Sequence, residues 1–259
     1  MNKRPLLITF ITLAICNTTV AQFAVKEFKH TEVHYIDGYV EGTGESRLFS
    51  VSSKKYPESA KKINNQLFQK QMNKSFVATA PIDSYFPVRD EYGIKQSFDY
   101  EILENSKRFL TVHVSYQRPN KDVRSHRYYT FISVTGDLKE MWDLIDEDSF
   151  YKIATMAFKS YAKNLDTYIS KMDTTNAKTK EQYNVLVECA KFYFEKENRF
   201  EYGYIYLMSD GVHCINPPCP THYGYHPKSD WFTCKFSYNK FKPYFTKRII
   251  KYGKRGVWL

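Results

Sequence analysis

Apolar and polar residues alternate along several segments of the chain, which is the pattern of strands that bury one face. The clearest pair, residues 98–103 and 109–116, flanks turn-forming residues at 104–107 and predicts a hairpin. Residues 128–134 repeat the alternation and end at a Thr-Gly-Asp turn. Three successive strands of this kind predict an antiparallel meander, whose apolar face needs a helix or a second sheet to cover it.

Other segments have the spacing of helices. Pro57 suits the first position of a helix and predicts one of roughly four turns. Two further helices are predicted over residues 150–172 and 180–197, where apolar side chains recur on one face. Asp148 and Ser149 precede the first of them and are its predicted N-cap pair.

The C-terminal third contains two aromatic segments. Residues 204–208 predict a strand that leads through the turn at residues 209–211 into a loop rich in Cys, His and Pro. Residues 231–238 predict a second aromatic strand. We therefore predict an α+β fold in which antiparallel strands, the meander plus these C-terminal strands, pack against two or three helices.

The composition supports a folded core. The chain has 259 residues, of which 42% are hydrophobic and 17% aromatic, including 22 Tyr and 19 Phe. This content excludes a disordered chain. Tyrosine combines an apolar ring with a polar tip, so it suits half-buried sheet faces and contact surfaces.

The N-terminus predicts an export signal over residues 1–21. Lys3 and Arg4 precede an apolar stretch at residues 5–16, and small residues at 19–21 offer a cleavage site before Gln22. The apolar stretch is too short to span a membrane, and no later segment is apolar enough to do so. Without Lys3 and Arg4, 36 basic residues remain against 28 acidic ones, so the net charge falls from +10 to +8.

The predicted destination is the periplasm or the medium. A lipoprotein is the alternative, because Leu-Ala-Ile-Cys ending at Cys16 resembles a lipobox, although Ile15 is large for its position. We expect a single envelope domain over residues 22–246 and a basic C-terminal tail over 247–259 that is solvated. The tail also has the composition to rest on anionic lipid or envelope polysaccharide. Export argues against a nucleic-acid partner.

Four cysteines remain after cleavage, which suits disulfides in an oxidising compartment: Cys189, Cys214, Cys219 and Cys234. Four cysteines allow three connectivities, and the sequence does not choose among them. A turn over Ile-Asn-Pro-Pro could bring Cys214 and Cys219 together. Cys189 would then pair with Cys234.

Free thiols and a zinc site are the alternatives to a disulfide in this region. Cys214, Cys219, His222 and His226 follow the pattern C-x4-C and H-x3-H, and each half has metal-ligand spacing. The two halves are too close for a finger helix, so zinc would be held in a loop. A disulfide with surface histidines explains the same residues in an exported protein, and we expect no cofactor.

Motifs of the common catalytic sites are missing from the sequence. There is no G-x-S-x-G elbow, phosphate-binding Gly loop or dinucleotide fingerprint. His222 and His226 resemble the histidine pair of polysaccharide deacetylases, but those enzymes also use adjacent aspartates, and this chain has no Asp-Asp pair. We therefore expect no catalytic residue, and a catalytic role stays the alternative.

The order of several short motifs resembles a known family. The motifs are YTFISVTG at 129–136, WDLI at 142–145, YLMSDGV at 206–212 and FTCKFSY at 232–238 followed by FKPY. This order is similar to an uncharacterised extracellular domain shared by the lysozyme-sensing anti-sigma factor and the non-catalytic N-terminal part of PdaC-type peptidoglycan deacetylases. The resemblance covers an N-terminal half at about 29–140 and a C-terminal half at about 141–246. It implies an α+β fold that binds rather than catalyses.

Two departures from the family lie in loops, where binding specificity resides. Of the family's Gly-Gly-Ala-His loop this chain keeps only His126, and its cysteine- and histidine-rich loop is unusual. We predict an exported, non-catalytic binding domain of the bacterial cell envelope, with a peptidoglycan, another glycan or a protein as ligand. A metal-assisted hydrolase or deacetylase that uses the Cys/His loop, and a purely structural envelope protein, are the alternatives. The predicted ligand contacts are His126, His213, Tyr223, Tyr225 and Trp231.

Overall fold

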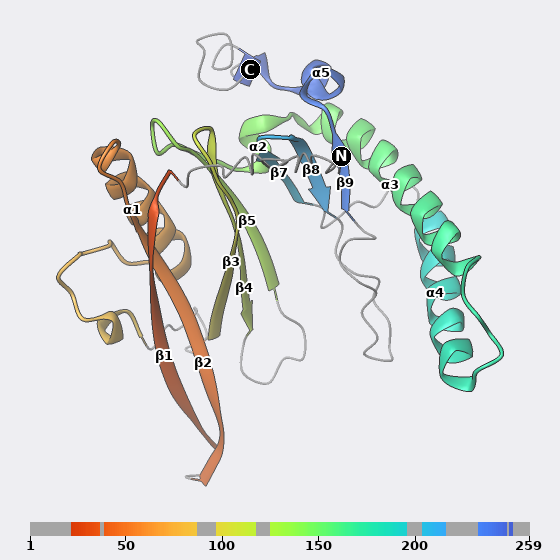
Figure 1. Cartoon of the computed structure of the whole chain (residues 1–259), viewed down its shortest axis with the longest axis horizontal. Coiled ribbons are helices and arrows are strands. Elements are labelled where there is room, and N and C mark those ends of the chain that lie inside the picture. Colours follow the sequence, from red (N-terminus) through yellow and green to blue (C-terminus); the bar gives the residue numbers. More distant parts are fainter. Residues whose placement is uncertain are drawn as a thin grey trace, which may run out of the picture.

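The computed structural model describes residues 22–36, 39–86, 97–117, 125–195, 204–215, 233–247 and 249–250. Within these ranges the chain combines antiparallel sheets with helices, which confirms the predicted α+β class (Figure 1). The strands are β1 (Ala24–Ile36), β2 (Tyr39–Ser52), β3 (Ser97–Asn105), β4 (Phe109–Gln117), β5 (Ser125–Ile132), β6 (Leu138–Lys139), β7 (Tyr204–Met208), β8 (Gly211–Ile215) and β9 (Thr233–Phe236). The helices are α1 (Pro57–Met72), α2 (Met141–Leu144), α3 (Glu147–Ile169), α4 (Ala177–Glu195) and α5 (Tyr238–Phe241), with short 3-10 turns η1 (Ile82–Tyr85) and η3 (Lys242–Tyr244).

The described strands form three sheets. Their orders are β1-β2, β3-β4-β5-β6 and β7-β8-β9, and all pairs are antiparallel. The second sheet contains the predicted meander, and β7 matches the first predicted aromatic strand. The second aromatic strand was predicted too long, because Tyr238 already begins α5.

Strand β8 was not predicted, since residues 211–215 were assigned to the loop. Its first residue, Gly211, has a φ of +149° in the turn from β7. A Cβ atom there would lie 2.4 Å from the backbone oxygen of Phe236 on β9. Only glycine at this position lets β8 and β9 approach this closely. Strand β8 is thus defined by its pairing with β7 and β9.

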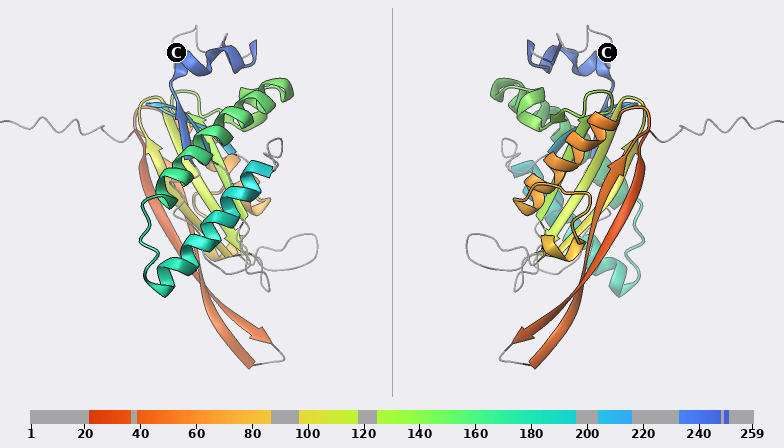
Figure 2. Two further views of the ribbon diagram at one scale, coloured as in Figure 1. Left: turned by 90° about the vertical axis from the view of Figure 1, so that its right-hand side faces the viewer. Right: turned by 90° about the vertical axis from the view of Figure 1, so that its left-hand side faces the viewer.

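The β1–β2 ribbon projects as an arm from the body of the molecule (Figures 1 and 2). Its base is held where the described chain begins. The side-chain oxygen of Asn105 accepts hydrogen bonds from the N–H groups of Gln22 and Phe23, both at 3.0 Å. The Asn105 amide donates to the Phe23 carbonyl at 2.8 Å, and the Phe23 side chain is buried. The two residues that precede β1 are thus fixed to Asn105, the last residue of β3.

Helix α1 begins at Pro57, as predicted, and ends where Asn73 takes the left-handed conformation with a φ of +51°. Its buried Asn64 joins the helix to β2, because the amide accepts from the N–H of Val51 at 2.8 Å and donates to its carbonyl at 2.9 Å. The helix covers one face of the meander (Figure 2).

Helix α3 begins three residues before the predicted start. Its N-cap is Asp146, whose carboxylate accepts from the N–H of Ser149 at 2.8 Å, so the predicted cap at Asp148 is wrong. Asp148 lies in the first turn instead, where its negative charge is favourable. Helices α3 and α4 run side by side and flank the third sheet (Figures 1 and 2).

Two hydrophobic clusters lie on opposite faces of the meander. The α1-side cluster includes Phe49, Ile63, Leu67, Leu110, Val112, Val114, Tyr129 and Phe131. The α3-side cluster includes Phe109, Ile132, Ile153, Leu165, Ile205, Leu207, Cys214, Cys234 and Phe241. Ile249, which falls within the predicted tail, is 1% exposed and also packs in the α3-side cluster. Strands β4 and β5 therefore contribute side chains to both cores.

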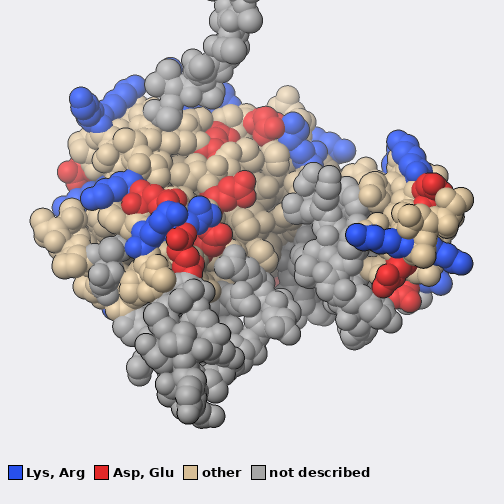
Figure 3. All heavy atoms as spheres, turned by 60° about the horizontal axis from the view of Figure 1, so that its bottom comes forward, with Lys and Arg blue, Asp and Glu red and all other residues tan. Residues whose placement is uncertain are grey.

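Charged residues of both signs are interspersed over the face drawn in Figure 3. Among the described residues, ion pairs join strands, such as Arg47 with Asp99 at 2.7 Å and Lys29 with Glu45 at 3.3 Å. The excess positive charge is thus not gathered into one stripe among the described residues of this face. Within the described ranges, no helix has the length and apolar character needed to cross a membrane.

Candidate functional site

The third sheet meets the meander through the edge of β7. Thr111 on β4 and Thr130 on β5 are directly opposite each other and both are fully buried. The Thr111 hydroxyl donates to the carbonyl of Leu207 at 2.6 Å, and the Thr130 hydroxyl accepts from its N–H at 3.1 Å. Buried backbone groups without a hydrogen-bond partner are costly. The two threonines provide partners for the N–H and the carbonyl of Leu207 on the edge of β7 that faces the meander.

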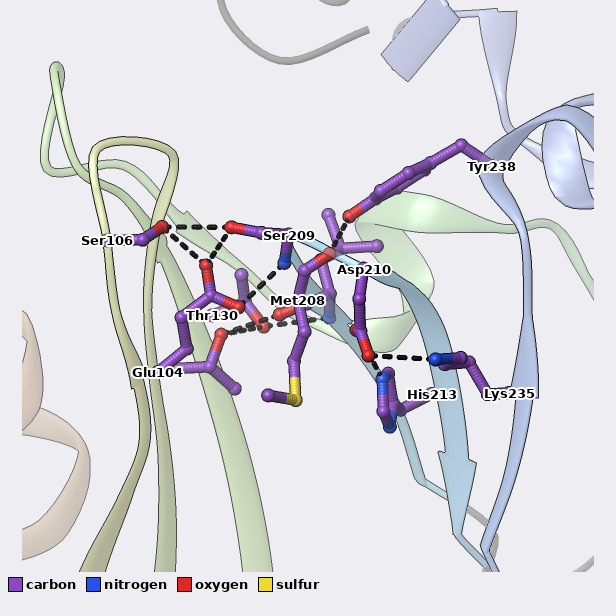
Figure 4. A network of polar contacts seen from close by, with 11 residues as sticks. Glu104, Ser106, Thr130, Met208, Ser209, Asp210, His213, Lys235 and Tyr238 are labelled. Carbon is purple, nitrogen blue, oxygen red and sulfur yellow. Dashed lines mark hydrogen bonds and ion pairs between the residues drawn. The ribbon is translucent and has the colours of Figure 1, made fainter. Parts of the chain in front are cut away.

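A β-bulge brings a carboxylate to the same junction. The register of β3 shifts between Ile102 and Glu104, so that Glu104 pairs with Thr111. Its carboxylate accepts hydrogen bonds from the N–H of Ser209 at 2.6 Å and from the hydroxyls of Ser209 and Ser106 (Figure 4). This carboxylate is already held by three donors, so it joins the β3–β4 turn to the β7–β8 turn.

Rings from both sheets lie beside this junction. His126 and Tyr128 occur on β5 at alternate positions with Thr130, and His113 on β4 lies opposite Tyr128. On the third sheet, Tyr206 on β7 lies opposite His213 on β8. Since alternate residues of a strand share a face, the rings of β4 and β5 lie on the face opposite the α1-side cluster. The rings of β7 and β8 lie on the face of the third sheet opposite the α3-side cluster.

Five of these rings stack in one row, which we call the ring row: His126, His113, Tyr128, Tyr206 and His213. Successive ring centroids are 5.1, 4.6, 4.8 and 5.4 Å apart, and the angles between neighbouring planes range from 7° to 26°. Tyr204 flanks the row with its centroid 5.2 Å from that of Tyr128. The row crosses from the second sheet to the third between Tyr128 and Tyr206, whose planes differ by 7°.

Polar contacts hold both ends of the ring row. At one end, His113 Nε2 lies 2.8 Å from His126 Nδ1, and Glu101 lies 3.9 Å from the other nitrogen of His113. At the other end, His213 Nε2 lies 2.8 Å from the carboxylate of Asp210, which also binds Lys235 at 3.0 Å (Figure 4). The histidine rings are thus fixed in orientation.

The charge of Asp210 is stabilised at this end. Partial burial acts to raise the pKa of its carboxyl, but hydrogen bonds from His213 and Lys235 outweigh this effect and hold the pKa below its ordinary value. Asp210 therefore stays ionised through the physiological range.

The tyrosines in the centre of the row stay neutral. Burial raises the pKa of Tyr206 to about 12, and burial also raises the pKa values of Tyr128 and Tyr204. The hydroxyls of Tyr128 and Tyr206 have no hydrogen-bond partner within the described ranges. They are neutral groups that can both donate and accept a hydrogen bond.

Across the described residues, no three His, Cys, Asp or Glu side chains are grouped so that they could hold a metal ion. Of the predicted zinc candidates, Cys214 is described, while Cys219, His222 and His226 lie outside the described residues. The zinc hypothesis therefore stays a prediction.

The structure places two of the predicted ligand contacts in the same row of rings. His126 and His213 lie at opposite ends of the ring row, although 87 positions separate them in the sequence. The other three predicted contacts, Tyr223, Tyr225 and Trp231, lie outside the described residues.

The predicted disulfide cysteines are spread over several elements. Cys214 on β8 lies directly opposite Cys234 on β9. Cys189 lies on α4, but its side chain is outside the described part, as is Cys219 altogether. The predicted pairing of Cys214 with Cys219 stays untested.

Sequence reasoning missed the centre of the row: His113, Tyr128, Tyr204 and Tyr206. A local signal exists, because polar-tipped rings occur at alternate positions 126 and 128, and again at 204 and 206. Alternation places each pair on one face of its strand. It does not reveal that the two faces adjoin, since this depends on how β7 packs on the meander.

No family model matches the chain, and no curated protein matches it. It is similar in structure to a DUF3298 family member from Bacteroides fragilis, with a TM-score of 0.54 at 9% identity over 90% of this chain and 97% of the other. It is also similar to a DUF3298 family protein from Pseudomonas aeruginosa, with a TM-score of 0.51 at 10% identity over 88% and 96% of the two chains. These similarities establish the fold of an uncharacterised domain.

Proposed function

We propose that the chain is an exported, non-catalytic binding domain of the bacterial cell envelope, and that its ligand is a glycan of the peptidoglycan type. The observation that carries the proposal is the ring row, with its neighbouring tyrosine hydroxyls that lack a partner in the described part of the chain. Tyr128 is half-buried and Tyr206 is 6% exposed. Tyrosine offers apolar contact area together with a hydrogen-bonding tip, which is the combination that recognition sites favour.

The electrostatics of the row support an uncharged, polyhydroxyl ligand. Tyr128 and Tyr206 are neutral at physiological pH, as a tyrosine with the ordinary pKa near 10 already is, and burial raises their pKa values further. At one end of the row Asp210 and Lys235 neutralise each other at 3.0 Å, and at the other end Glu101 lies 3.9 Å from His113. A sugar hydroxyl or an acetamido group matches such donors and acceptors without requiring a net charge.

The resemblance found in the sequence points in the same direction. The domain of the lysozyme-sensing anti-sigma factor and of PdaC-type deacetylases, which the motif order resembles, is extracellular and non-catalytic. The DUF3298 structures have a similar fold, which is that of an uncharacterised domain. The specific link to the anti-sigma factor and the deacetylases is part of the proposal.

Export is supported by the contacts of Gln22 and Phe23, the first residues that the structure describes. The predicted cleavage site precedes Gln22, and the N–H groups of Gln22 and Phe23 are both bound by Asn105. A chain cleaved at that site would keep every contact of β1. Intact mass of protein from the envelope fraction tests this: a chain starting at Gln22 is expected, and a diacylglyceryl mass on Cys16 would instead indicate a lipoprotein.

Co-sedimentation with insoluble peptidoglycan that has been stripped of protein tests the ligand. The wild-type chain is expected to sediment with it, and Tyr128→Phe to bind about 2- to 10-fold more weakly, because it loses one hydrogen-bonding hydroxyl. Tyr100→Phe is the matched control, since the Tyr100 hydroxyl donates to Glu27, away from the row.

Three outcomes would contradict the proposal. If the wild-type chain does not bind the stripped peptidoglycan, this glycan is not its ligand. Binding only to sacculi that retain their proteins would indicate a protein ligand. Equal affinities of the Tyr128→Phe and Tyr100→Phe variants for peptidoglycan would show that the ring row is not the binding site.

A further inference from the structure

Two cysteines are neighbours on adjacent strands of the third sheet. Cys214 on β8 and Cys234 on β9 are paired residues, and the next pair toward the loop is Ile215 with Thr233. Both side chains are buried in the α3-side cluster, with exposed fractions of 0% and 6%, and the two thiols hydrogen-bond to each other.

We propose that Cys214 and Cys234 form a cross-strand disulfide that closes the base of residues 216–232. Opposite residues in antiparallel strands have Cα atoms about 4.5–5.5 Å apart, which falls within the range of about 4.4–6.8 Å that a disulfide spans. The bond requires no change of strand register. Of the three possible connectivities, it selects the one that pairs Cys214 with Cys234 and Cys189 with Cys219.

The bond forms by thiol–disulfide exchange with a disulfide oxidant, such as oxidised glutathione or an oxidised dithiol oxidoreductase. One cysteine thiolate attacks the oxidant, which releases one reduced sulfur and leaves a mixed disulfide. The thiolate of the other cysteine attacks the protein sulfur of that mixed disulfide and releases the second reduced sulfur. The two thiol protons and two electrons end on the oxidant, which becomes two thiols.

Burial determines when this exchange takes place. Burial and the neighbouring thiol of Cys234 raise the pKa of Cys214, so little of it is thiolate in the folded state. Cys234 lies on the outer strand β9, while Cys214 lies on the central strand. The exchange therefore occurs while the third sheet is still open, before α3 covers it.

The consequence concerns the segment that the two cysteines enclose. Residues 216–232 carry the predicted ligand contacts Tyr223, Tyr225 and Trp231, and the disulfide would fix the separation of the segment's two ends. The oxidant in the cell depends on the proposed export. The bond itself does not, because purified protein can be oxidised in vitro.

Peptide mapping tests the pairing directly. The purified chain is refolded in a glutathione redox buffer, alkylated and digested with trypsin. Cleavage after Arg199, Lys228 and Lys235 places Cys214 and Cys219 together in residues 200–228, and Cys234 alone in residues 229–235. We expect these two peptides to be disulfide-linked. A bond within residues 200–228, or alkylated Cys234, would overturn the proposal.

Single variants distinguish Cys214 from Cys219 as the partner of Cys234. Cys219→Ser is the matched control and is expected to keep the linkage, while Cys214→Ser is expected to lose it. A linkage that persists in Cys214→Ser and vanishes in Cys219→Ser would assign the bond to Cys219 instead.

Thermal unfolding gives a readout that does not depend on mapping. In the Cys189→Ser/Cys219→Ser background, where Cys214 and Cys234 are the remaining cysteines after Gln22, the oxidised protein is expected to melt about 5–10 °C above its reduced form. Adding Cys214→Ser and Cys234→Ser to that background is expected to abolish the difference, and a shift of equal size without these two cysteines would contradict the assignment. These results stand apart from co-sedimentation with peptidoglycan, so the disulfide and the binding function can fail separately.

Discussion

The two faces of strands β4 and β5 differ in chemistry, although their residues alternate in the same sequence. Toward α1 the strands present Leu110, Val112 and Phe131, all fully buried. Toward the third sheet they present Phe109 and Ile132 of the α3-side cluster at one end, and threonines, histidines and a tyrosine along the rest. One face is a conventional hydrophobic core, while the other combines buried hydroxyls at the junction with half-buried rings beside it.

The two faces of this one sheet therefore have different roles. Burial of apolar area stabilises the α1 face without directional requirements. The opposite face holds β7 through directed hydrogen bonds and leaves the hydroxyls of Tyr128 and Tyr206 without a described partner. Substitutions on the first face should affect stability alone, whereas those on the second should affect sheet docking or ligand binding.

The largest expected effect is on the α1 face. Phe131→Ala removes a fully buried ring and should lower the free energy of unfolding by about 3–5 kcal/mol, because it leaves a cavity. Urea denaturation of the purified chain measures it. Tyr151→Ala, at a site where the ring is 54% exposed, is the control and should cost far less. Similar costs for the two variants would refute the assignment of the core.

A smaller effect is expected at the junction of the sheets. Thr130→Val should cost about 1–3 kcal/mol, because the buried N–H of Leu207 loses its acceptor while the side-chain volume hardly changes. The same denaturation experiment applies, with Thr155→Val on the exposed side of α3 as the matched change. If Thr130→Val is as stable as wild type, the hydroxyls do not hold β7.

The row should respond to alkaline pH, with no effect at neutrality. The folded-state pKa of Tyr206 is raised to about 12, whereas an unfolded tyrosine titrates near 10. The native state therefore keeps a proton that the unfolded state has lost, and stability falls as the pH rises from about 10 to 12. Tyr206→Phe should flatten this decline, which unfolding curves between pH 8 and 12 would measure. A decline of unchanged steepness would argue against burial of Tyr206.

The smallest expected effect is at the rim of the row. Asp210→Asn removes half-exposed ion pairs and should cost less than about 1 kcal/mol at neutral pH. Because the pKa of Asp210 is lowered in the fold, its contribution is present above the unfolded pKa of about 4 and is lost as the pH falls through the folded pKa. Stability curves for wild type and variant should therefore converge below pH 4. Curves that stay parallel would exclude Asp210 as the cause.

Much of the secondary structure could be predicted from local pattern. Pro57 marks the start of α1, and the alternation at residues 98–116 predicted the β3–β4 hairpin. The start of α3 was misplaced because Asp146 and Asp148 both suit an N-cap, and the choice depends on which carboxylate reaches the N–H of Ser149. Strand β8 was missed because its five residues have no strong pattern and depend on pairing.

The candidate site could be predicted only in part. His126 and His213 were predicted as contacts from their loops, whereas the structure places both on strands, joined by rings that the sequence analysis did not single out. The stack between Tyr128 and Tyr206 joins residues 78 positions apart. No spacing rule covers a contact of that range.

The sequence by itself determined the fold class and most helices and strands, because these follow from periodicity, caps and turn residues within short windows. The tertiary structure alone decided which side chains meet: Thr130 with Leu207, Tyr128 with Tyr206, and Cys214 with Cys234. The reason is physical, since the alternation of a strand sets which face a residue occupies, while packing between distant elements sets what that face contacts.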